Sequence, residues 1–244
     1  MSTDSPIARQ VWNAGRALSR SMRGLTFAAP VAFVYNPLDY ASAAHRVYVD
    51  RFAGSRKKTI FLGMNPGPFG MAQTGVPFGE VAMVRDWMGI EAKIKRPPAE
   101  HPKRPITGFD CTRSEVSGAR LWGAVAEHWG DPENFFADNF VVNYCPLLFV
   151  EESGRNRTPD KLPATEREPI YAACDRHLRK LVDILAPDLL VGVGAFAADR
   201  ARRTLGTDAL RIETVLHPSP ASPRANRGWK EQAAQELMAI GLCR

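Results

Sequence analysis

Short apolar runs that alternate with helical segments constrain this chain more than any other feature of its sequence. We expect buried strands at 59–62, 140–142, 189–193 and 212–216, with helices between them. Strands that alternate with helices are typical of a mostly parallel sheet covered by helices on both faces. The fold class is therefore α/β, and ligands should bind where the strands end.

The spacing of apolar side chains also places the helices. They are expected at about 6–22, 41–52, 81–88, 121–129, 165–185, from 195 onward, and at 229–240. Thr165 and Glu168 have the spacing of a capping box at the start of the fifth of these. We expect residues 1–244 to form one domain, in which residues 1–25 are an N-terminal helical extension.

Composition excludes several classes of protein. With 45% hydrophobic and 24% charged residues, the chain is neither disordered nor a coiled coil. It contains no apolar run of the roughly 18 residues that a membrane span requires, and no apolar segment near its start typical of a secretory signal. Cys111, Cys145, Cys174 and Cys243 lack the close spacing of a zinc or iron–sulfur site. We therefore expect reduced, mostly buried thiols, and neither a metal nor a cofactor.

Three distinctive segments follow expected strands, so we expect them to meet at one edge of the sheet. The first is a loop rich in glycine and proline that begins at Gly63. Its Asn65 can orient a water or a substrate, although the loop can equally be a rigid structural turn. Phe78, between Pro77 and Gly79, is either a stacking surface for a flat ring or a core residue.

The second and third segments carry Asn143 and His217. The amide of Asn143 can donate and accept hydrogen bonds at once, which suits the edge of a nucleobase, but it can also cap the following turn. His217, followed by a proline, can act as acid or base or stabilise negative charge, or it can be structural. We interpret the remaining histidines as non-catalytic; they are His45, His101, His128 and His177.

The formal net charge of +6 weakly favours a polyanionic partner. Basic residues form four groups, which lie at 93–104, 155–161, 200–203 and 224–230. Each group is either a contact to phosphate or a solvated face, and we prefer the solvated face for the group at 200–203. Gly192, Gly194 and Ala197 match a dinucleotide-binding pattern with Glu213 downstream, but the pattern lies in the third strand–helix unit, and we favour simple packing.

Together these segments resemble the single-strand-selective monofunctional uracil-DNA glycosylase family, within the uracil-DNA glycosylase superfamily. The resemblance rests on GMNPGPFGMAQTGVPFG at 63–79, NYCPLL at 143–148 and HPSP at 217–220. It extends over about 27–242 and includes EVSGAR at 115–120 and SGRN at 153–156. It implies a three-layer αβα sandwich around a four-stranded, mostly parallel sheet.

The resemblance also implies roles for individual residues. Asn65 would position the attacking water and His217 would stabilise the departing uracil anion. The residues implied to bind the base are Met64, Gly67, Met71, Phe78 and Asn143. Those implied to contact DNA, as a wedge entering the duplex, are Pro218, Ser219, Pro220, Ala221, Arg224 and Arg227. Relatives in the family carry arginine directly after His-Pro-Ser-Pro, where this chain has Ala221. This departure concerns the filling role of the wedge and hence the efficiency of the protein on duplex DNA.

The implied reaction is hydrolysis of the N-glycosidic bond of a flipped-out uracil, in single- and double-stranded DNA, leaving an abasic site. Acceptance of 5-hydroxymethyluracil is expected by resemblance, as is a monomer that needs no cofactor. DNA is the expected partner, without a membrane, in the cytoplasm at a bacterial nucleoid or in a eukaryotic nucleus. The alternatives are a glycosylase for xanthine or hypoxanthine, a non-catalytic module that binds single-stranded DNA, and an NAD enzyme.

Overall fold

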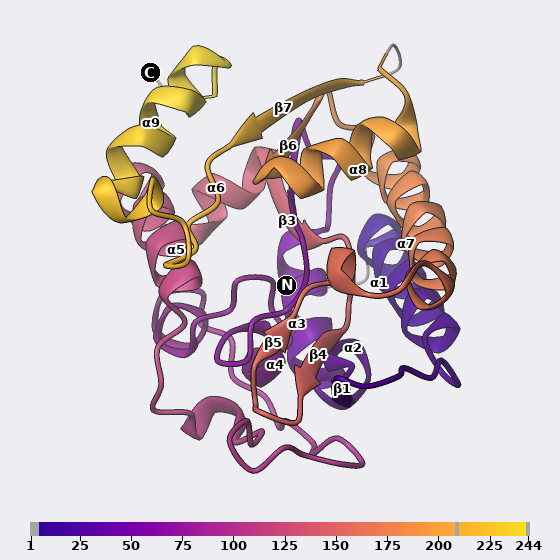
Figure 1. The fold of residues 1–244 in the computed structure, drawn as a ribbon. Coiled ribbons are helices and arrows are strands. Elements are labelled where there is room, and N and C mark those ends of the chain that lie inside the picture. The colour runs from indigo at the N-terminus through magenta and orange to yellow at the C-terminus, as the bar shows by residue number, and fades with distance from the viewer. Residues whose placement is uncertain (1–4, 208–209, 243–244) are drawn as a thin grey trace.

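A parallel sheet runs through the centre of the computed structural model, which describes residues 5–207 and 210–242 (Figure 1). Its strands lie in the order β3 (Asn139–Asn143), β2 (Thr59–Gly63), β6 (Leu189–Val193) and β7 (Arg211–Val215). All neighbouring strands are parallel. The four predicted strands are confirmed, although β7 begins and ends one residue earlier than expected.

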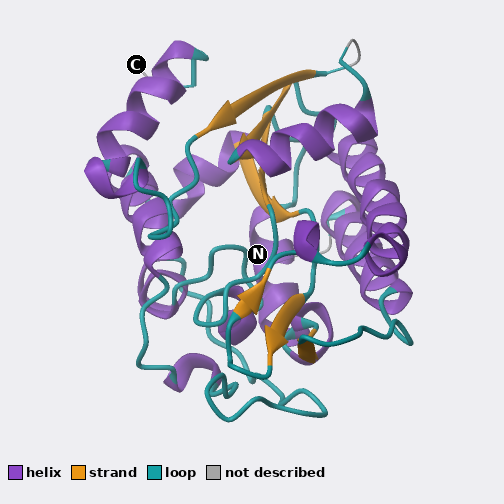
Figure 2. Ribbon diagram, viewed as in Figure 1, coloured by secondary structure: helices purple, strands orange, loops and turns teal. Residues whose placement is uncertain are grey.

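Helices account for most of the remaining regular structure (Figure 2). They are α1 (Pro6–Ser21), α2 (Pro37–Tyr40), α3 (Ser42–Phe52), α4 (Met71–Thr74), α5 (Val116–Trp129), α6 (Pro132–Asp138), α7 (Ala164–Leu185), α8 (Ala195–Leu205) and α9 (Trp229–Ala239). Short helical turns lie at η1 (Met83–Trp87), η2 (Gly108–Asp110), η3 (Pro159–Lys161) and η4 (Ala225–Arg227). None of the described helices has the length and apolar character needed to cross a bilayer.

Alternating side chains of the strands give the sheet its two covered faces. Phe140 of β3 packs on Tyr48 of α3, with ring centroids 5.2 Å apart. The next residue, Val141, points the other way, toward α5 and α9. Helices α1, α3, α7 and α8 cover the first face, and α5 and α9 cover the second. The predicted α/β fold, a three-layer sandwich, is confirmed.

The N-terminal helix belongs to the first of these layers. Ser5 caps it by accepting a hydrogen bond from the N–H of Ile7 at 3.2 Å. Its buried side chains, among them Val11 and Leu18, pack against α3 and α7. Residues before position 5, which the expected extension includes, lie outside the described part of the chain.

The predicted capping box at the start of α7 is wrong. The helix begins at Ala164, so Thr165 already lies in its first turn, and no side chain caps it. Glu168 forms an ion pair with Arg167 instead. A proline at the preceding position, Pro163, stops the chain from being helical earlier and sets the boundary in place of a hydroxyl cap.

A second, smaller sheet was not expected. It is antiparallel and joins β1 (Val31–Tyr35), β4 (Leu148–Glu151) and β5 (Asn156–Arg157). Strand β4 begins five residues after the end of β3, so this sheet holds the segment that follows Asn143. Of the four cysteines, Cys145 and Cys174 are buried free thiols and Cys111 is half-buried, while Cys243 lies outside the described residues.

Candidate functional site

The ends of β2 and β3 bring the base-binding candidates together. Gly63 and Asn143 are register partners in these strands. A Cβ on Gly63 would lie 2.2 Å from Asn143 Oδ1 and 2.7 Å from the Phe78 ring, so amide and ring both lie against this glycine. The Phe78 ring centroid is 5.8 Å from that of His217. The three segments singled out in the sequence therefore meet at one edge of the sheet.

Backbone carbonyls orient the side-chain amide of Asn65. Its Nδ2 donates a hydrogen bond to the carbonyl of Leu147 at 3.1 Å and a longer one to the carbonyl of Pro66 at 3.5 Å. Because a carbonyl only accepts, the other amide atom must be oxygen. Among the described residues nothing donates to this Oδ1, and the side chain is half-buried. The oxygen is free to accept a hydrogen bond from a water.

Asn143 is almost fully buried, at 6% exposure. Its Nδ2 lies 3.2 Å from the sulfur of Met71, a weak acceptor, so its hydrogen-bonding capacity is largely unused. This contact also places Met71 at the site, as expected. Met64 follows Gly63 directly, and its carbonyl accepts a hydrogen bond from Cys145 N–H at 2.9 Å, which joins the two strand exits.

His217 has a defined tautomer. Its Nδ1 accepts a hydrogen bond from the N–H of Ser219 at 3.0 Å, so the ring proton resides on Nε2. Burial lowers the pKa of His217 to about 4, because the charged form loses its hydration. The imidazole is therefore neutral at pH 7 and presents an N–H donor.

The dinucleotide-like pattern has a packing role, as favoured from the sequence. A Cβ on Gly192 would lie 2.4 Å from the backbone nitrogen of Ala198, so this glycine lets α8 approach β6. Gly194 has φ +93°, and a Cβ there would lie 3.1 Å from His217 Cβ. The second glycine thus makes room for the histidine.

Phe78 has an unusual backbone conformation. Its φ is +53°, in the left-handed region that residues with a Cβ rarely adopt. Helix α5 holds it there: a Cβ on Gly118 would lie 2.1 Å from the Phe78 carbonyl, and Trp122 Nε1 donates to the carbonyl of Pro77 at 3.3 Å. Such outliers cluster at functional sites, and no local sequence pattern predicts this one.

Glu115 is a residue of the site that sequence reasoning did not single out for a role. Cβ atoms on Gly67 and Gly70 would lie 2.4 Å and 2.8 Å from its side chain, so the Asn65 loop packs directly on this glutamate. Burial raises the pKa of Glu115, and hydrogen bonding from the backbone of Phe69 and Ser117 offsets part of that effect. The structure therefore gives Gly67 a packing role against a buried carboxyl group.

The expected DNA-binding segment after His217 is held from α5. Arg120 donates to the carbonyl of Pro218 at 3.1 Å and to Asn226 Oδ1 at 3.0 Å. Asn226 in turn donates to the carbonyl of Pro220 at 2.8 Å. The backbone of the segment is thus closed on itself, with Pro218 buried and Pro220 exposed.

The side chains of this segment differ in their availability. Ser219 Oγ accepts a hydrogen bond from Ala221 N–H at 3.1 Å. Arg224 donates to Gln232 and forms an ion pair with Glu236 at 2.7 Å. Arg227 is exposed, and its guanidinium has no hydrogen bond or ion pair among the described residues. Arg224, the arginine nearest to Ala221, is therefore committed to α9.

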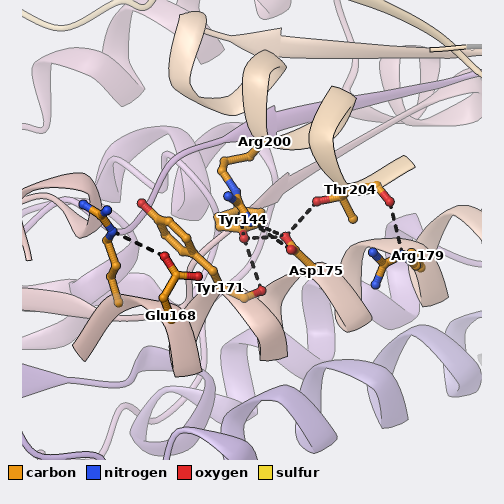
Figure 3. A network of polar contacts seen from close by, with 8 residues as sticks. Tyr144, Glu168, Tyr171, Asp175, Arg179, Arg200 and Thr204 are labelled. Carbon is orange, nitrogen blue, oxygen red and sulfur yellow. Dashed lines mark hydrogen bonds and ion pairs between the residues drawn. The ribbon is translucent and has the colours of Figure 1, made fainter. Parts of the chain in front are cut away.

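A polar network surrounds Tyr144, the residue that follows Asn143 in the chain (Figure 3). The hydroxyl of Tyr144 donates to Asp175 at 2.5 Å and accepts from Arg200 at 3.1 Å. Arg200 contacts both oxygens of Asp175, at 2.9 Å and 2.8 Å, and Thr204 donates to the same carboxylate at 2.7 Å. The preferred interpretation of a solvated face is therefore wrong for Arg200, whose side chain is only 16% exposed.

Of the remaining histidines, which we interpret as non-catalytic, His45 contacts the 63–79 motif through its Nδ1 and the carbonyl of Gly75 at 2.9 Å. His45, His128 and His177 are on helices and His101 is in the basic loop, as expected. Across residues 5–207 and 210–242, no three His, Cys, Asp or Glu side chains group as a metal site. An apolar hollow of about 220 Å³ lies between α5 and α9, and none of the candidate site residues lines it.

Comparison with known proteins relates this site to a family. The model of the uracil DNA glycosylase superfamily matches residues 50–238. The single-strand selective monofunctional uracil-DNA glycosylase of Rattus norvegicus is 52% identical over 227 residues, which cover 92% of this chain and 82% of the relative. Its counterparts in Mus musculus and Bos taurus are also 52% identical, over 81% and 84% of their lengths.

A solved structure supports the fold independently. That of SMUG2 from Pedobacter heparinus superposes with a TM-score of 0.70 and covers 96% of each chain. At 17% sequence identity this likeness concerns the fold alone.

Proposed function

The chain belongs to the uracil DNA glycosylase superfamily, and we propose that it hydrolyses the N-glycosidic bond of uracil in DNA and leaves an abasic site. The observation that carries the proposal is the meeting of Phe78, Asn143 and the neutral His217 at the edge where parallel strands end, with Asn65 two residues after the end of β2. A module that only binds DNA needs neither an oriented amide nor a neutral imidazole.

The reaction begins with extrusion of the target nucleotide, because the bond to be cleaved is inaccessible within a base stack. Unstacking costs a few kcal/mol, and the cost is lowest for an unpaired base. The Phe78 ring, held in place by α5, is positioned to stack on the extruded base.

Asn65 then orients the nucleophile. Its Nδ2 is fixed on the carbonyl of Leu147, and its Oδ1 accepts a hydrogen bond from the attacking water. As the bond to the base breaks, the sugar acquires oxocarbenium character and accepts a weak nucleophile. An oriented water therefore suffices without a carboxylate base, unlike in glycosidases with paired carboxylates.

His217 stabilises the leaving group. Negative charge develops on uracil O2, and the Nε2–H of the neutral ring donates a hydrogen bond to it. A preorganised donor of this kind lowers the barrier by roughly 3–4 kcal/mol. The uracil departs as an anion, and the water proton balances the charge once the abasic sugar has formed.

Asn143 supplies the base specificity. Its Oδ1 accepts from uracil N3–H and its Nδ2 donates to O4, an arrangement that cytosine opposes at both positions. Met71 and the backbone around Met64 and Gly67 complete the base site. A mismatch would leave buried polar groups unpaired, which gives strong discrimination.

We propose single- and double-stranded DNA as substrates and 5-hydroxymethyluracil as a second base that the protein releases. We further propose that the protein acts as a monomer, needs no cofactor and works where the cell's DNA lies. Pro218, Ser219, Pro220, Ala221, Arg224 and Arg227 form the proposed wedge. Because Ala221 is small and Arg224 is paired to Glu236, the wedge lacks a long side chain to fill the space that an extruded base leaves in a duplex. Single strands are therefore the better substrate.

The test is abasic-site formation on a uracil-containing single strand, with cytosine, xanthine and 5-hydroxymethyluracil strands in parallel. Asn65→Ala and His217→Ala should each lose at least about a hundredfold in rate. Exposed His128, on α5 and outside the site, supplies the control His128→Ala, which should retain native activity. Full activity in both site variants would refute the proposed site, and preference for xanthine would change the proposed substrate.

A further inference from the structure

Two arginines flank an aromatic ring on the Asn65 loop. The guanidinium carbon of Arg113 lies 3.9 Å from the Phe69 ring centroid, and that of Arg104 lies 5.2 Å from it. Both distances are those of cation–π contacts, which hold a guanidinium without consuming its N–H donors. We call Phe69, Arg104 and Arg113 the cationic platform.

The platform is fastened to the Asn65 loop by one buried amide. Gln73 is fully buried, and its Nε2 donates to the carbonyls of Pro68 at 2.9 Å and Pro105 at 3.0 Å. Its Oε1 accepts from the N–H groups of Thr107 at 2.9 Å and Gly108 at 3.0 Å. All four hydrogen-bonding positions of the amide are used. The segment that carries Arg104 is thus fixed to the loop that carries Asn65.

A second side chain fixes the same segment to the small sheet. The hydroxyl of Tyr35 donates to the carbonyl of Arg104 at 2.8 Å and accepts from the N–H of His101 at 2.7 Å. The backbone at Arg104 is therefore held from two sides, so placement of its guanidinium needs little further ordering.

Neither guanidinium of the platform is neutralised. Among the described residues, no carboxylate forms a salt bridge with Arg104 or Arg113. Glu115, the acidic residue closest in sequence to Arg113, is engaged by the backbone of Phe69 and Ser117 instead. Arg104 Nη1 donates to the carbonyl of Lys103 at 2.9 Å and its Nε is buried, which leaves Nη2 for a ligand, and Arg113 is exposed. Arg200 and Arg224, by contrast, are both ion-paired.

The platform lies close to the site of chemistry. Phe69 follows Asn65 by four residues, which span at most about 14 Å even when fully extended. Both guanidiniums are therefore within reach of the backbone of a strand whose flipped nucleotide occupies the site. Planar forks of N–H donors match phosphate oxygens, and such contacts position nucleic acid without reading its sequence.

We propose that the cationic platform binds backbone phosphates of single-stranded DNA beside the flipped nucleotide, an inference that rests on the proposed function. Each phosphate contact releases counterions, so the logarithm of the affinity for a single strand falls with that of the salt concentration by about 0.7 per contact. Two contacts account for about 1.4 of the slope.

The experiment measures binding of the full-length protein to a fluorescent single strand of thymidine that lacks uracil, from 50 to 200 mM salt. Arg104→Gln and Arg113→Gln should each lower the slope by about 0.7, and the double variant by about 1.4. The affinity lost by the double variant should then be about sevenfold greater at 50 mM than at 200 mM salt. Because Arg113 is exposed, its single variant tests the proposal without risk to folding.

The control is Arg203→Gln, which removes an exposed arginine near the end of α8, a helix that runs back from the edge where β6 ends (Figure 1). It should leave the slope unchanged. A native slope in the double variant, or an equal fall in the control, would overturn the proposal. Uracil release by the native protein is measured separately, so a protein that releases uracil but shows no change in slope refutes the platform alone. A protein that releases no uracil refutes the proposed function.

Discussion

Acidification tests the state of His217 most directly. The residue is half-buried, its Nδ1 accepts from Ser219 N–H, and loss of hydration lowers its pKa to about 4. If the neutral ring is the active form, about 90% of the protein still carries a neutral ring at pH 5, because pH 5 lies one unit above the pKa of His217. A histidine with the ordinary pKa of 6.5 would be only about 3% neutral at that pH. The two cases differ by about thirtyfold in rate.

The assay is single-turnover release of uracil from a single strand between pH 8 and pH 4.5, limited to conditions in which circular dichroism remains native. We expect a rate that is nearly flat down to pH 5 and falls below it. Titration of the His217 ring carbons by NMR should give the same midpoint, and His217→Ala should be slow at every pH. A midpoint near 6.5 in both measurements would refute the reasoning from burial.

Three further predictions concern the site and its stability. Asn143→Asp should slow uracil release by about a hundredfold or more, since it replaces a donor by an acceptor, and release from a cytosine strand is measured in parallel; unchanged kinetics would argue against edge recognition. Gly63→Ala should abolish uracil release, because its Cβ would lie 2.2 Å from Asn143 Oδ1, whereas Gly123→Ala, with open space around it, should retain activity. Burial lowers the pKa values of His45 and His177 to about 4, so between pH 4 and pH 6.5 the unfolded state binds more protons than the folded state. Each residue therefore contributes about 3 kcal/mol to the free energy of unfolding above pH 6.5, and this contribution is lost as the pH falls toward 4. Urea unfolding at pH 7 and pH 5 measures this loss, and equal stabilities would contradict it.

The central sheet could be predicted because its strands are continuous apolar runs that end in unusual residues. Leu189–Val193 is buried throughout, and such a run between helical segments has few other structures open to it. The same logic placed Asn143 and His217 at strand ends. Strands β1 and β4 are short apolar runs as well, but they pair with each other in a separate antiparallel sheet and so fall outside the pattern that predicts the central sheet. Strand β5 has only two residues, and pairing alone defines it.

The sequence alone does not predict which polar groups contact one another across the fold. Glu115 and Gly67 are far apart in the chain, so nothing local indicates that a carboxyl group fills the space of a Cβ. Arg200 stands in an arginine-rich helix that has every mark of a solvated face, and only folding brings Asp175 and Tyr144 to it. Long-range contacts of this kind are set by tertiary packing.

The two hydrogen bonds of Arg120 hold the segment that follows His217 independently of the side chains at residues 221–223. Arg120 donates to the Pro218 carbonyl and to the Asn226 side chain, and so fixes the two ends of the segment 218–226. Neither hydrogen bond involves residues 221–223. Ala221 and Pro223 are exposed and can therefore be exchanged without disturbing the His217 imidazole, whereas Ser222 Oγ accepts a hydrogen bond from Ala225 N–H at 3.3 Å and helps to hold the segment. Under the proposed function, substitutions at Ala221 and Pro223 should change the preference between paired and unpaired DNA without changing the chemistry.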